Sequence, residues 1–303
     1  MSTTQGTAAR HNGQQSQPLL SGIQMNQNDP LIRSFLAYAR LLGRYHQYRV
    51  MHLERLESLL RQGRRVVLVS NHALDIIDPL LFTTALIDRC GCMPYFIGHE
   101  NMVFDAPGLG DLDKRFHMVH SRHMEDSVQA LQKGGLLMLY PGSGSEAAQR
   151  SYRDEPYRLK WDDRLGFLQL ALRCDAELIF VAAVGIDEMY YQSAMEIPHW
   201  LLRLNSAERY IGSRMQFGAF GPHFLPTLGT FPVQISHVVS KPIDLGDRAA
   251  ALDSPAVLQQ LHRRVVAHCQ RLLTAAVARR DTDAPLLDRT VRAGERFLQR
   301  LGI

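Results

Sequence analysis

Cysteine is scarce in this sequence, and long uncharged apolar stretches are missing altogether. Its 303 residues include four cysteines, Cys90, Cys92, Cys174 and Cys269, which are too scattered to form a disulfide framework. Cys90 and Cys92 lack the two-residue spacer of common zinc and redox pairs. Nowhere do about eighteen uncharged apolar residues follow one another, so we expect no membrane-spanning helix. A reducing cytoplasm is the simplest compartment for such a chain.

The sequence also lacks a large net charge of either sign. The 34 Lys and Arg residues face 30 Asp and Glu residues, a formal net charge of +4, and no Lys/Arg block alternates with aromatic residues. We therefore expect no nucleic-acid partner, whereas an anionic membrane face or an acidic carrier protein suits the mildly basic composition. We expect no metal, because His99, His117, His120 and His123 lack a paired spacing and carboxylate partners. No sequence feature calls for a cofactor.

Composition divides the chain into four segments. Residues 1–29 are rich in small polar residues, lack the marks of a secretory signal, and predict a disordered tail. Residues 30–62 carry apolar residues at helical spacing with arginines between them, which predicts an amphipathic helical segment. Its arginines would face either solvent or a bilayer interface. We expect residues 63–250 to form the main domain and residues 251–303 to form C-terminal helices.

The main domain alternates apolar, β-branched runs with helical patterns. Strands are predicted at residues 65–70, 95–98, 136–140, 178–183 and 231–239, and helices at residues 124–133, 164–174, 254–279 and 286–301. This alternation predicts an α/β fold with a largely parallel sheet flanked by helices. Functional sites in such sheets lie at the carboxyl ends of the strands.

Two loops that follow predicted strands can together supply the parts that an acyl transfer needs, a base with an orienting acid and backbone donors for an oxyanion. In the first, Asn71–Asp78, a histidine lies within about one helical turn of a carboxylate, which is the arrangement of a general base and the acid that orients it. In the second, Pro141–Glu146, Gly142 and Gly144 allow backbone N–H groups to approach a developing oxyanion. A structural histidine and a tight turn explain the same residues when each loop is taken alone. The second loop is neither a Walker loop nor a nucleophile elbow.

The order of motifs resembles the glycerolipid acyltransferases, the family that includes 1-acylglycerol-3-phosphate acyltransferase. Asn71-His72 followed by Asp78-Pro79 is similar to the first block of the family, Asn-His-x4-Asp. Ser121-Arg122 is similar to the second block, which ends in an arginine that contacts the acceptor. Pro141–Glu146 resembles the third block in the form Pro-Gly-Gly-x-Arg-Glu, found in the diacylglycerol acyltransferase branch that acts on neutral glycerides.

Two later segments extend the resemblance. Leu178–Ala183 lies where the fourth, hydrophobic block of the family belongs, and Val238–Ile243 looks like its late strand ending in Gly-x-Pro-Ile. Five blocks thus occur in order between Val66 and Asp244, and this order is far more specific than any single block. The resemblance makes residues 63–250 the acyltransferase domain.

The resemblance implies roles for particular residues. It makes His72 and Asp78 the catalytic pair, and it assigns substrate binding to Asn71, Arg122, Gly142, Ser143, Gly144, Ser145 and Glu146. The donor would be acyl-CoA or an acyl-carrier protein, and the acceptor a lysophospholipid or a partial glyceride. The protein would work at the cytoplasmic face of a membrane as a peripheral protein.

The first block departs from the family pattern in its spacing. Five residues instead of four separate His72 from Asp78, while Asp75 lies only three positions after His72. Either carboxylate can therefore orient the imidazole. Asp78 is favoured because its Asp-Pro-Leu-Leu context matches the family and a loop absorbs an extra residue more easily than it loses one.

The third block departs from the pattern in its charge. Ser145 stands where the family has an arginine, and Ser143 replaces the second glycine. Because arginine is well suited to phosphate recognition, its loss weakens the case for a phosphate-bearing acceptor. Arg150 or Arg153 can substitute for it, although both lie on a polar stretch where a solvated arginine is ordinary.

Two other functions fit the same motifs. A thioesterase or lipid hydrolase would use the same His-Asp pair with water as the acceptor, and would cleave a thioester without forming a lipid product. A non-catalytic lipid-binding protein would tolerate the altered spacing and the missing arginine, and would bind vesicles equally well with His72 replaced.

Overall fold

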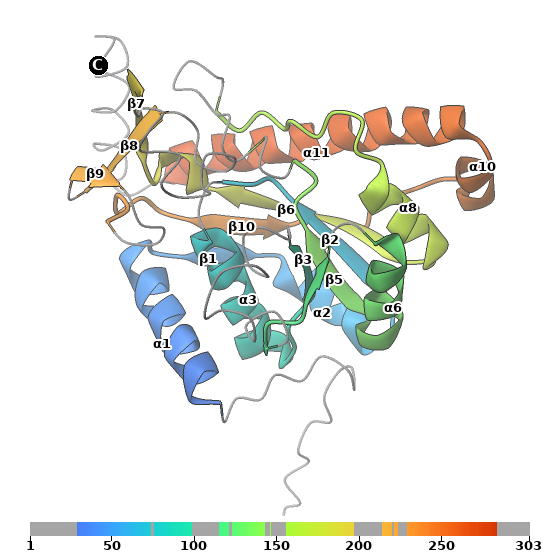
Figure 1. Ribbon diagram of the computed structural model, residues 1–303, viewed down its shortest axis with the longest axis horizontal. Helices are drawn as coiled ribbons and strands as arrows, with labels where there is room; N and C mark the ends of the chain where they lie inside the picture. The colour runs from blue at the N-terminus through green and yellow to red at the C-terminus, as the bar shows by residue number, and fades with distance from the viewer. Residues whose placement is uncertain are drawn as a thin grey trace, which may run out of the picture.

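A computed structural model gives the fold. It describes residues 29–73, 76–98, 115–120, 123–142, 146, 156–196, 214–219, 221–223 and 229–283. Figure 1 shows a central sheet with helices on both of its faces. This is the α/β architecture that the alternation of apolar runs and helical patterns predicts.

The central sheet has seven strands. In spatial order they are β1 (Arg49–Met51), β10 (Ser236–Val239), β6 (Glu177–Val184), β2 (Val66–Ser70), β5 (Leu136–Leu139), β3 (Tyr95–Gly98) and β4 (Met118–His120). The five strands from β6 to β4 are parallel. Strand β10 runs antiparallel to β6, and β1 pairs with β10 in parallel. The prediction of a largely parallel sheet is confirmed.

The middle strands are apolar along their whole length because both faces of the sheet are covered. Every residue of β2 and β5 is buried. Val67 and Val69 pack into one hydrophobic cluster, and Val66 and Leu68 pack into another on the opposite face. An uninterrupted apolar run, rather than an alternating one, is typical of such doubly covered parallel strands.

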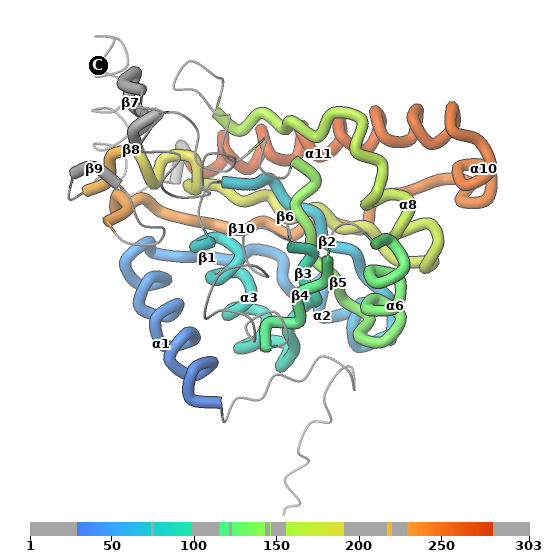
Figure 2. Tube along the Cα trace, viewed as in Figure 1, coloured from blue at the N-terminus to red at the C-terminus, as the bar shows by residue number. Residues whose placement is uncertain are grey.

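In the described part of the chain, helices cover both faces of the sheet. On one face lie α1 (Pro30–Tyr45), α2 (Leu53–Arg61) and α3 (Ile77–Cys90), and on the other α6 (Met124–Gly134), α8 (Gly166–Arg173) and α11 (Pro255–Asp283). The short helix α10 (Arg248–Asp253) leads into α11, which Figure 2 shows in orange across the sheet from α1 and α3. None of the helices in the described part of the chain is long and apolar enough to cross a bilayer.

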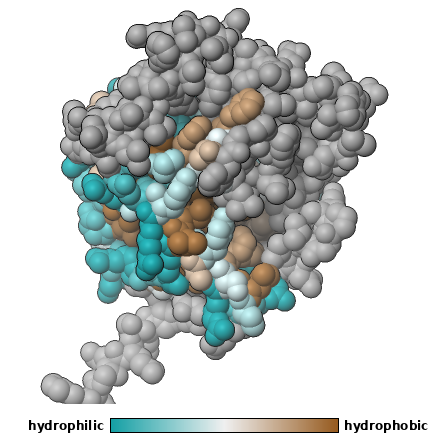
Figure 3. Space-filling view, turned by 90° about the vertical axis from the view of Figure 1, so that its left-hand side faces the viewer, coloured by the Kyte–Doolittle hydropathy of each residue, from teal (hydrophilic) through white to brown (hydrophobic). Residues whose placement is uncertain are grey.

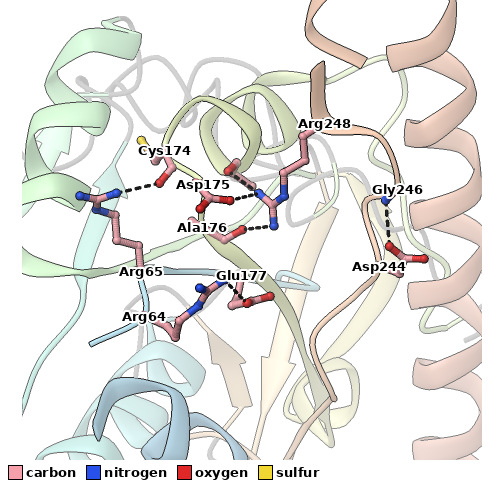
Figure 4. Close-up of polar contacts among 10 residues, drawn as sticks. Arg64, Arg65, Cys174, Asp175, Ala176, Glu177, Asp244, Gly246 and Arg248 are labelled. Atoms are coloured by element: carbon pink, nitrogen blue, oxygen red, sulfur yellow. Dashed lines mark hydrogen bonds and ion pairs between the residues drawn. The ribbon is translucent and has the colours of Figure 1, made fainter. Parts of the chain in front are cut away.

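The amino ends of the central strands are joined by polar contacts (Figure 4). The Arg64 guanidinium lies 2.6 Å from the Glu177 carboxylate, which links the segment before β2 to the start of β6. Arg248 donates to the carbonyl oxygens of Ala171 and Ala176 at 3.2 and 3.1 Å. These contacts hold the end of the sheet opposite the one where the predicted site lies.

Several elements differ from the sequence-based expectation. The segment 30–62 contains strand β1 between its two helices. Strand β1 has only three residues, which are too few to show a period of their own. Gln47 and His52, near its two ends, have positive φ angles of 46° and 63°. Asp78-Pro79 is a helix-start signature in the sequence, but helix α3 begins slightly earlier, at Ile77. The predicted tail, apart from Asp29, and the predicted helix at 286–301 lie outside the described residues.

A second, smaller sheet was not predicted. It consists of three antiparallel strands, β7 (Tyr191–Glu196), β8 (Arg214–Gly218) and β9 (Gly221–His223), and it follows the one-turn helix η1 (Ile186–Glu188) after β6. The pairing of β7 with β8 shifts register between Gln192 and Glu196, and this irregularity blurs the alternation that a strand shows in a sequence.

Candidate active site

Asn71 fixes the carboxyl end of strand β2. Its side chain is fully buried, donates from Nδ2 to the Ala183 carbonyl at 2.8 Å, and accepts at Oδ1 from the Ala183 N–H at 2.8 Å. The side-chain amide of Asn71 thus makes the two hydrogen bonds to β6 that a further backbone residue of β2 would make. The next residue, His72, is thereby held at the edge of the sheet. A direct contact between Asn71 and a substrate stays a prediction.

His72 lies against the end of the neighbouring strand. It is partly exposed, and its ring centroid is 4.6 Å from that of Tyr140 with the two planes inclined by 32°. Tyr140 follows β5, and the parallel register of Val69 with Leu139 brings the residues after both strands side by side. The two loops that the sequence singles out therefore meet at one edge of the sheet.

Asp78 lies in the first turn of α3 with no exposed surface. Two buried hydroxyls, those of Tyr48 and Tyr140, lie within its electrostatic reach. Burial first, and then the negative charge of Asp78, raises the pKa of both tyrosines well above the ordinary value. Both phenols therefore stay protonated at neutral pH. Tyr140 thus packs against the ring of His72 and lies near the carboxylate of Asp78.

A second histidine, His237 on β10, offers a contrast with His72. It is fully buried, with its ring centroid 5.5 Å from that of Tyr48 and 5.1 Å from that of Phe82. Neither ring nitrogen has a hydrogen-bond partner among the residues that the structure describes. Burial lowers the pKa of His237 from 6.5 to about 3, so this imidazole is neutral and packs as an apolar ring.

The loop after β5 is held from both sides. Glu146 is fully buried, and its Oε2 accepts a hydrogen bond from Nε1 of Trp161 at 3.1 Å. The N–H of Glu146 donates to the Gly142 carbonyl at 3.1 Å. Arg164 donates from Nη1 to the carbonyl oxygens of Pro141 and Gly142 at 3.0 and 2.8 Å. The backbone that begins this loop is therefore oriented before any substrate arrives.

Gly142 is required by the close approach of Glu146. A Cβ atom placed on Gly142 would lie 1.7 Å from Oε2 and 2.4 Å from Cβ of Glu146. Contacts this short force part of the loop to move. The glycine that the sequence suggests for its small size thus has a defined steric role, which is to let a buried carboxylate fold back over the turn.

The structure describes five of the predicted site residues. Asn71, His72 and Asp78 surround the carboxyl end of β2, and Gly142 and Glu146 lie beyond the end of β5. Outside the described residues are Asp75, Arg122, Ser143, Gly144 and Ser145, together with Arg150 and Arg153. The choice between Asp75 and Asp78 therefore stays a prediction in favour of Asp78.

Four residues that shape the site are missed by sequence reasoning. These are Tyr48, Tyr140, Trp161 and Arg164. Tyr140 directly precedes the third block, and its position beside Pro141 is a usable signal. Tyr48 comes from a segment about thirty residues upstream of Asp78 with no local pattern of its own, and Trp161 and Arg164 lie well beyond the loop that they hold.

At this edge of the sheet, a histidine ends a parallel core strand, a buried carboxylate lies in the following helix, and an oriented loop follows the next strand. This arrangement suits general-base chemistry. Residues 49–184 match the family model described as Acyltransferase, so this part of the chain is similar to that family. The match begins at β1 and ends with β6, so it contains both loops of the site, whereas the fifth block on β10 lies beyond it.

Curated relatives match a larger part of the chain. A protein of Gallus gallus is 27% identical over 214 residues, which are 68% of this chain and 59% of the relative. A protein of Bos taurus is 25% identical over 208 residues, 68% of this chain and 55% of the relative. Both carry the name "DGAT1/2-independent enzyme synthesizing storage lipids". The chain spans less than two thirds of the length of these relatives.

One solved structure resembles the chain at low identity. The crystal structure of the 1-acyl-sn-glycerophosphate (LPA) acyltransferase of Thermotoga maritima aligns with a TM-score of 0.47 and 14% identity, covering 81% of this chain and 80% of that one.

Proposed function

We propose that this protein transfers a fatty acyl group from acyl-CoA or an acyl-carrier protein to a hydroxyl of a lysophospholipid or a partial glyceride. His72 is the general base, and Asp78 orients it. One observation carries the proposal: the ring centroid of His72 lies 4.6 Å from that of Tyr140, whose pKa is raised by burial first and then by the charge of Asp78. The partly exposed His72 and the buried Asp78 thus both lie near Tyr140.

The proposed reaction needs no covalent enzyme intermediate. The acceptor hydroxyl oxygen attacks the thioester carbonyl carbon while His72 takes the hydroxyl proton, and Asp78 stabilises the imidazolium that forms. The carbonyl oxygen becomes an oxyanion near the loop of Gly142 to Ser145. The tetrahedral carbon then expels the thiolate, which takes the proton from His72. The products are an acyl ester and a free thiol.

A partial glyceride is the acceptor that the third block favours. This block has the neutral-glyceride form and lacks the arginine that suits a phosphate, because Ser145 stands in its place. The curated relatives are named for the synthesis of storage lipids, which supports the same choice. We therefore expect mono- or diacylglycerol to be a better acceptor than a lysophospholipid with a free phosphate.

Helix α1 supplies a surface for the membrane on which such lipids reside. It packs into the core through buried Ile32, Leu36, Ala39 and Leu42. Large apolar side chains nevertheless remain exposed on α1, Leu31 by 42%, Leu41 by 62% and Tyr45 by 41%, and Ile76 just before α3 is exposed by 44%. Figure 3 views the molecule from this side and shows apolar side chains at the surface among hydrophilic ones.

This surface combines apolar and basic groups. Arg33, Arg40 and Arg44 are exposed on the same helix, and Arg40 forms an exposed ion pair with Asp88 of α3 at 2.6 Å. Apolar side chains flanked by arginines suit the interface of a membrane with anionic lipids. In the proposed orientation α1 rests on the cytoplasmic face of the bilayer as a peripheral contact, with Ile76 near the lipid side of the active site.

The test is acyl transfer by the purified protein. Labelled acyl-CoA is incubated with lysophospholipids, monoacylglycerol and diacylglycerol, and the labelled lipids are separated. We expect His72→Ala to lower the rate about 10²- to 10⁴-fold, the range that a general base contributes. The matched control is His123→Ala, because His123 is exposed and its side chain does not cap α6, so its rate stays at the wild-type level.

The other outcomes are distinct. Transfer that survives His72→Ala removes the histidine from the mechanism. Release of fatty acid without any acyl lipid, dependent on His72, identifies a thioesterase or hydrolase. Vesicle binding that is unchanged by His72→Ala, with no turnover of any donor, identifies a lipid-binding protein. Repeating the assay with acyl-carrier protein decides which thioester is used.

A further inference from the structure

A groove of about 780 Å³ lies between α11, strand β10 and the residues that lead out of β1. Its floor is apolar. The sheet contributes Phe180, Ala182 and Val238, and α11 contributes Val265, Leu272 and Ala276. The volume falls within the range of about 300–1,000 Å³ that is typical of small-ligand sites.

The groove lies on the opposite face of the sheet from the predicted catalytic carboxylate. Phe180 and Ala182 belong to the hydrophobic cluster beneath α8 and α11. Ala183, their neighbour on β6, points the other way into the cluster with α1 and α3, where Asp78 lies in the first turn of α3. A ligand in this groove therefore occupies a place other than the reaction site.

The rim of the groove is basic. Helix α11 contributes Arg264, His268, Arg271 and Arg279, whose spacings of four, three and eight residues place them on one side of the helix. Arg55 and Lys241 contribute the facing side. The basic stripe of α11 runs directly beside its apolar stripe, so cationic groups border a hydrophobic floor along the length of the groove.

Among the described residues that line the groove, Asp244 is the single carboxylate, and it forms a hydrogen bond within its own turn. Oδ1 of Asp244 accepts a hydrogen bond from the Gly246 N–H at 2.9 Å (Figure 4). Within the described part of the chain, Lys241, Arg264 and Arg271 form no ion pair with a carboxylate. The charges of Lys241, Arg264 and Arg271 are therefore not neutralised by a direct carboxylate partner among the residues that the structure describes.

We infer that this groove binds a single-chain lipid with a phosphate head group, as a second lipid site apart from the reaction centre. Cationic side chains on the rim hold the phosphate through charge-assisted hydrogen bonds. The acyl chain lies on the apolar floor, where its burial removes apolar surface from water. The rim supplies the cations that the third-block loop lacks at Ser145, so the two sites differ in the head group that they favour.

The test localises a lipid by photolabelling and needs no turnover. Dodecyl phosphate carrying a diazirine in its chain is irradiated with the full-length protein below the micelle concentration, and the labelled peptides are mapped by mass spectrometry. We expect label on the peptides of residues 238–244 and 264–279. Unlabelled dodecyl phosphate should compete with it, whereas glycerol phosphate, a head group without a chain, should not.

Two neighbouring arginines give a matched pair of variants. Arg263 and Arg264 are both exposed on α11, but only Arg264 lines the groove. Arg264→Glu or Arg271→Glu should reduce the labelling about tenfold, equivalent to 1.4 kcal/mol, and Arg263→Glu should leave it unchanged. Ala275→Trp keeps the charge but fills the groove, because Ala275 lines it from an exposed position, and it should abolish the label.

The inference stands apart from the proposed reaction. Label that is absent from both peptides overturns it, as does equal labelling of the Arg263→Glu and Arg264→Glu variants. Full competition by glycerol phosphate also overturns it, because the chain would then contribute nothing. In each groove variant the His72-dependent transfer to a short-chain acceptor should keep its wild-type rate, so a failure here and a failure of the catalytic assignment remain distinguishable.

Discussion

Asp78 and Glu146 are two fully buried carboxylates that follow adjacent parallel strands, and their surroundings differ. Asp78 lies near two protonated phenols, one of which stacks on a partly exposed histidine. Glu146 accepts from the Trp161 indole and folds back over Gly142. Burial alone therefore does not identify a catalytic acid. The titratable groups around Asp78 support its proposed role as the partner of His72, whereas the contacts of Glu146 suit a residue that supports a loop.

The largest difference between the two carboxylates should appear in catalysis. Asp78→Asn keeps the shape of the side chain but removes the charge that, in the proposed mechanism, stabilises the imidazolium of His72. We expect kcat to fall about 10³-fold, close to 4 kcal/mol of transition-state stabilisation, with a melting temperature near that of the wild type. Steady-state transfer assays and thermal unfolding measure the two quantities.

Glu146→Gln is the matched control for that variant. The amide keeps an oxygen that can accept from Trp161, so the loop should stay in place and kcat should fall less than about tenfold. If Glu146→Gln lost as much activity as Asp78→Asn, Glu146 would take part in the chemistry, and the distinction between the two carboxylates would be wrong.

The loop role of Glu146 predicts a steric effect at Gly142. Gly142→Ala places a Cβ atom 1.7 Å from Oε2 of Glu146, and the forced shift should cost about 3 kcal/mol, at the upper end of the range for overpacking. Gly43→Ala in α1 is the control, because its Cβ atom would meet Leu81 and Tyr48 at ordinary distances of 3.6 and 3.7 Å. That variant should keep or raise the stability. Urea unfolding of both variants checks the contrast.

The two histidines near the site extend the comparison to acid stability. His237 has a folded-state pKa of about 3 against 6.5 in the unfolded chain, so protons favour unfolding as the pH falls below about 6.5. The resulting loss is about 2 kcal/mol between pH 7 and pH 5. His237→Leu should lack this part of the pH dependence. If the unfolding free energies of the wild type and of His237→Leu changed in parallel between pH 7 and pH 5, His237 would not stay neutral in the folded state.

Much of the fold follows from local patterns. The apolar runs of β2, β5 and β6 and the helical periods of α6 and α11 are long enough to be read directly from the sequence, and all five appear close to their predicted bounds. Strand β1 does not, because its three residues depend on pairing with β10, nearly two hundred positions away in the chain. Tertiary pairing of this kind leaves no local signal.

The same limit applies to the site. His72, Asp78 and Gly142 can be predicted because they lie within short motifs next to core strands. Tyr48 and Trp161 cannot, because each reaches its carboxylate from a different part of the chain through the packing of the fold. Sequence motifs thus locate the two loops, and the structure shows which of their carboxylates is surrounded by titratable groups.

The smallest effect tests the contact that separates Glu146 from Asp78. Trp161→Phe removes the indole N–H that donates to Glu146 at 3.1 Å and keeps an aromatic ring against Phe167 and Phe180. The loss should be about 1–2 kcal/mol of unfolding free energy, because a buried acceptor loses its donor. The double variant with Glu146→Gln should lose less than the sum of the two single variants, since both changes alter the same hydrogen bond. Fully additive losses would mean that the indole stabilises the loop by packing alone, and the assignment of Glu146 as a hydrogen-bonded support of that loop would then have to be given up.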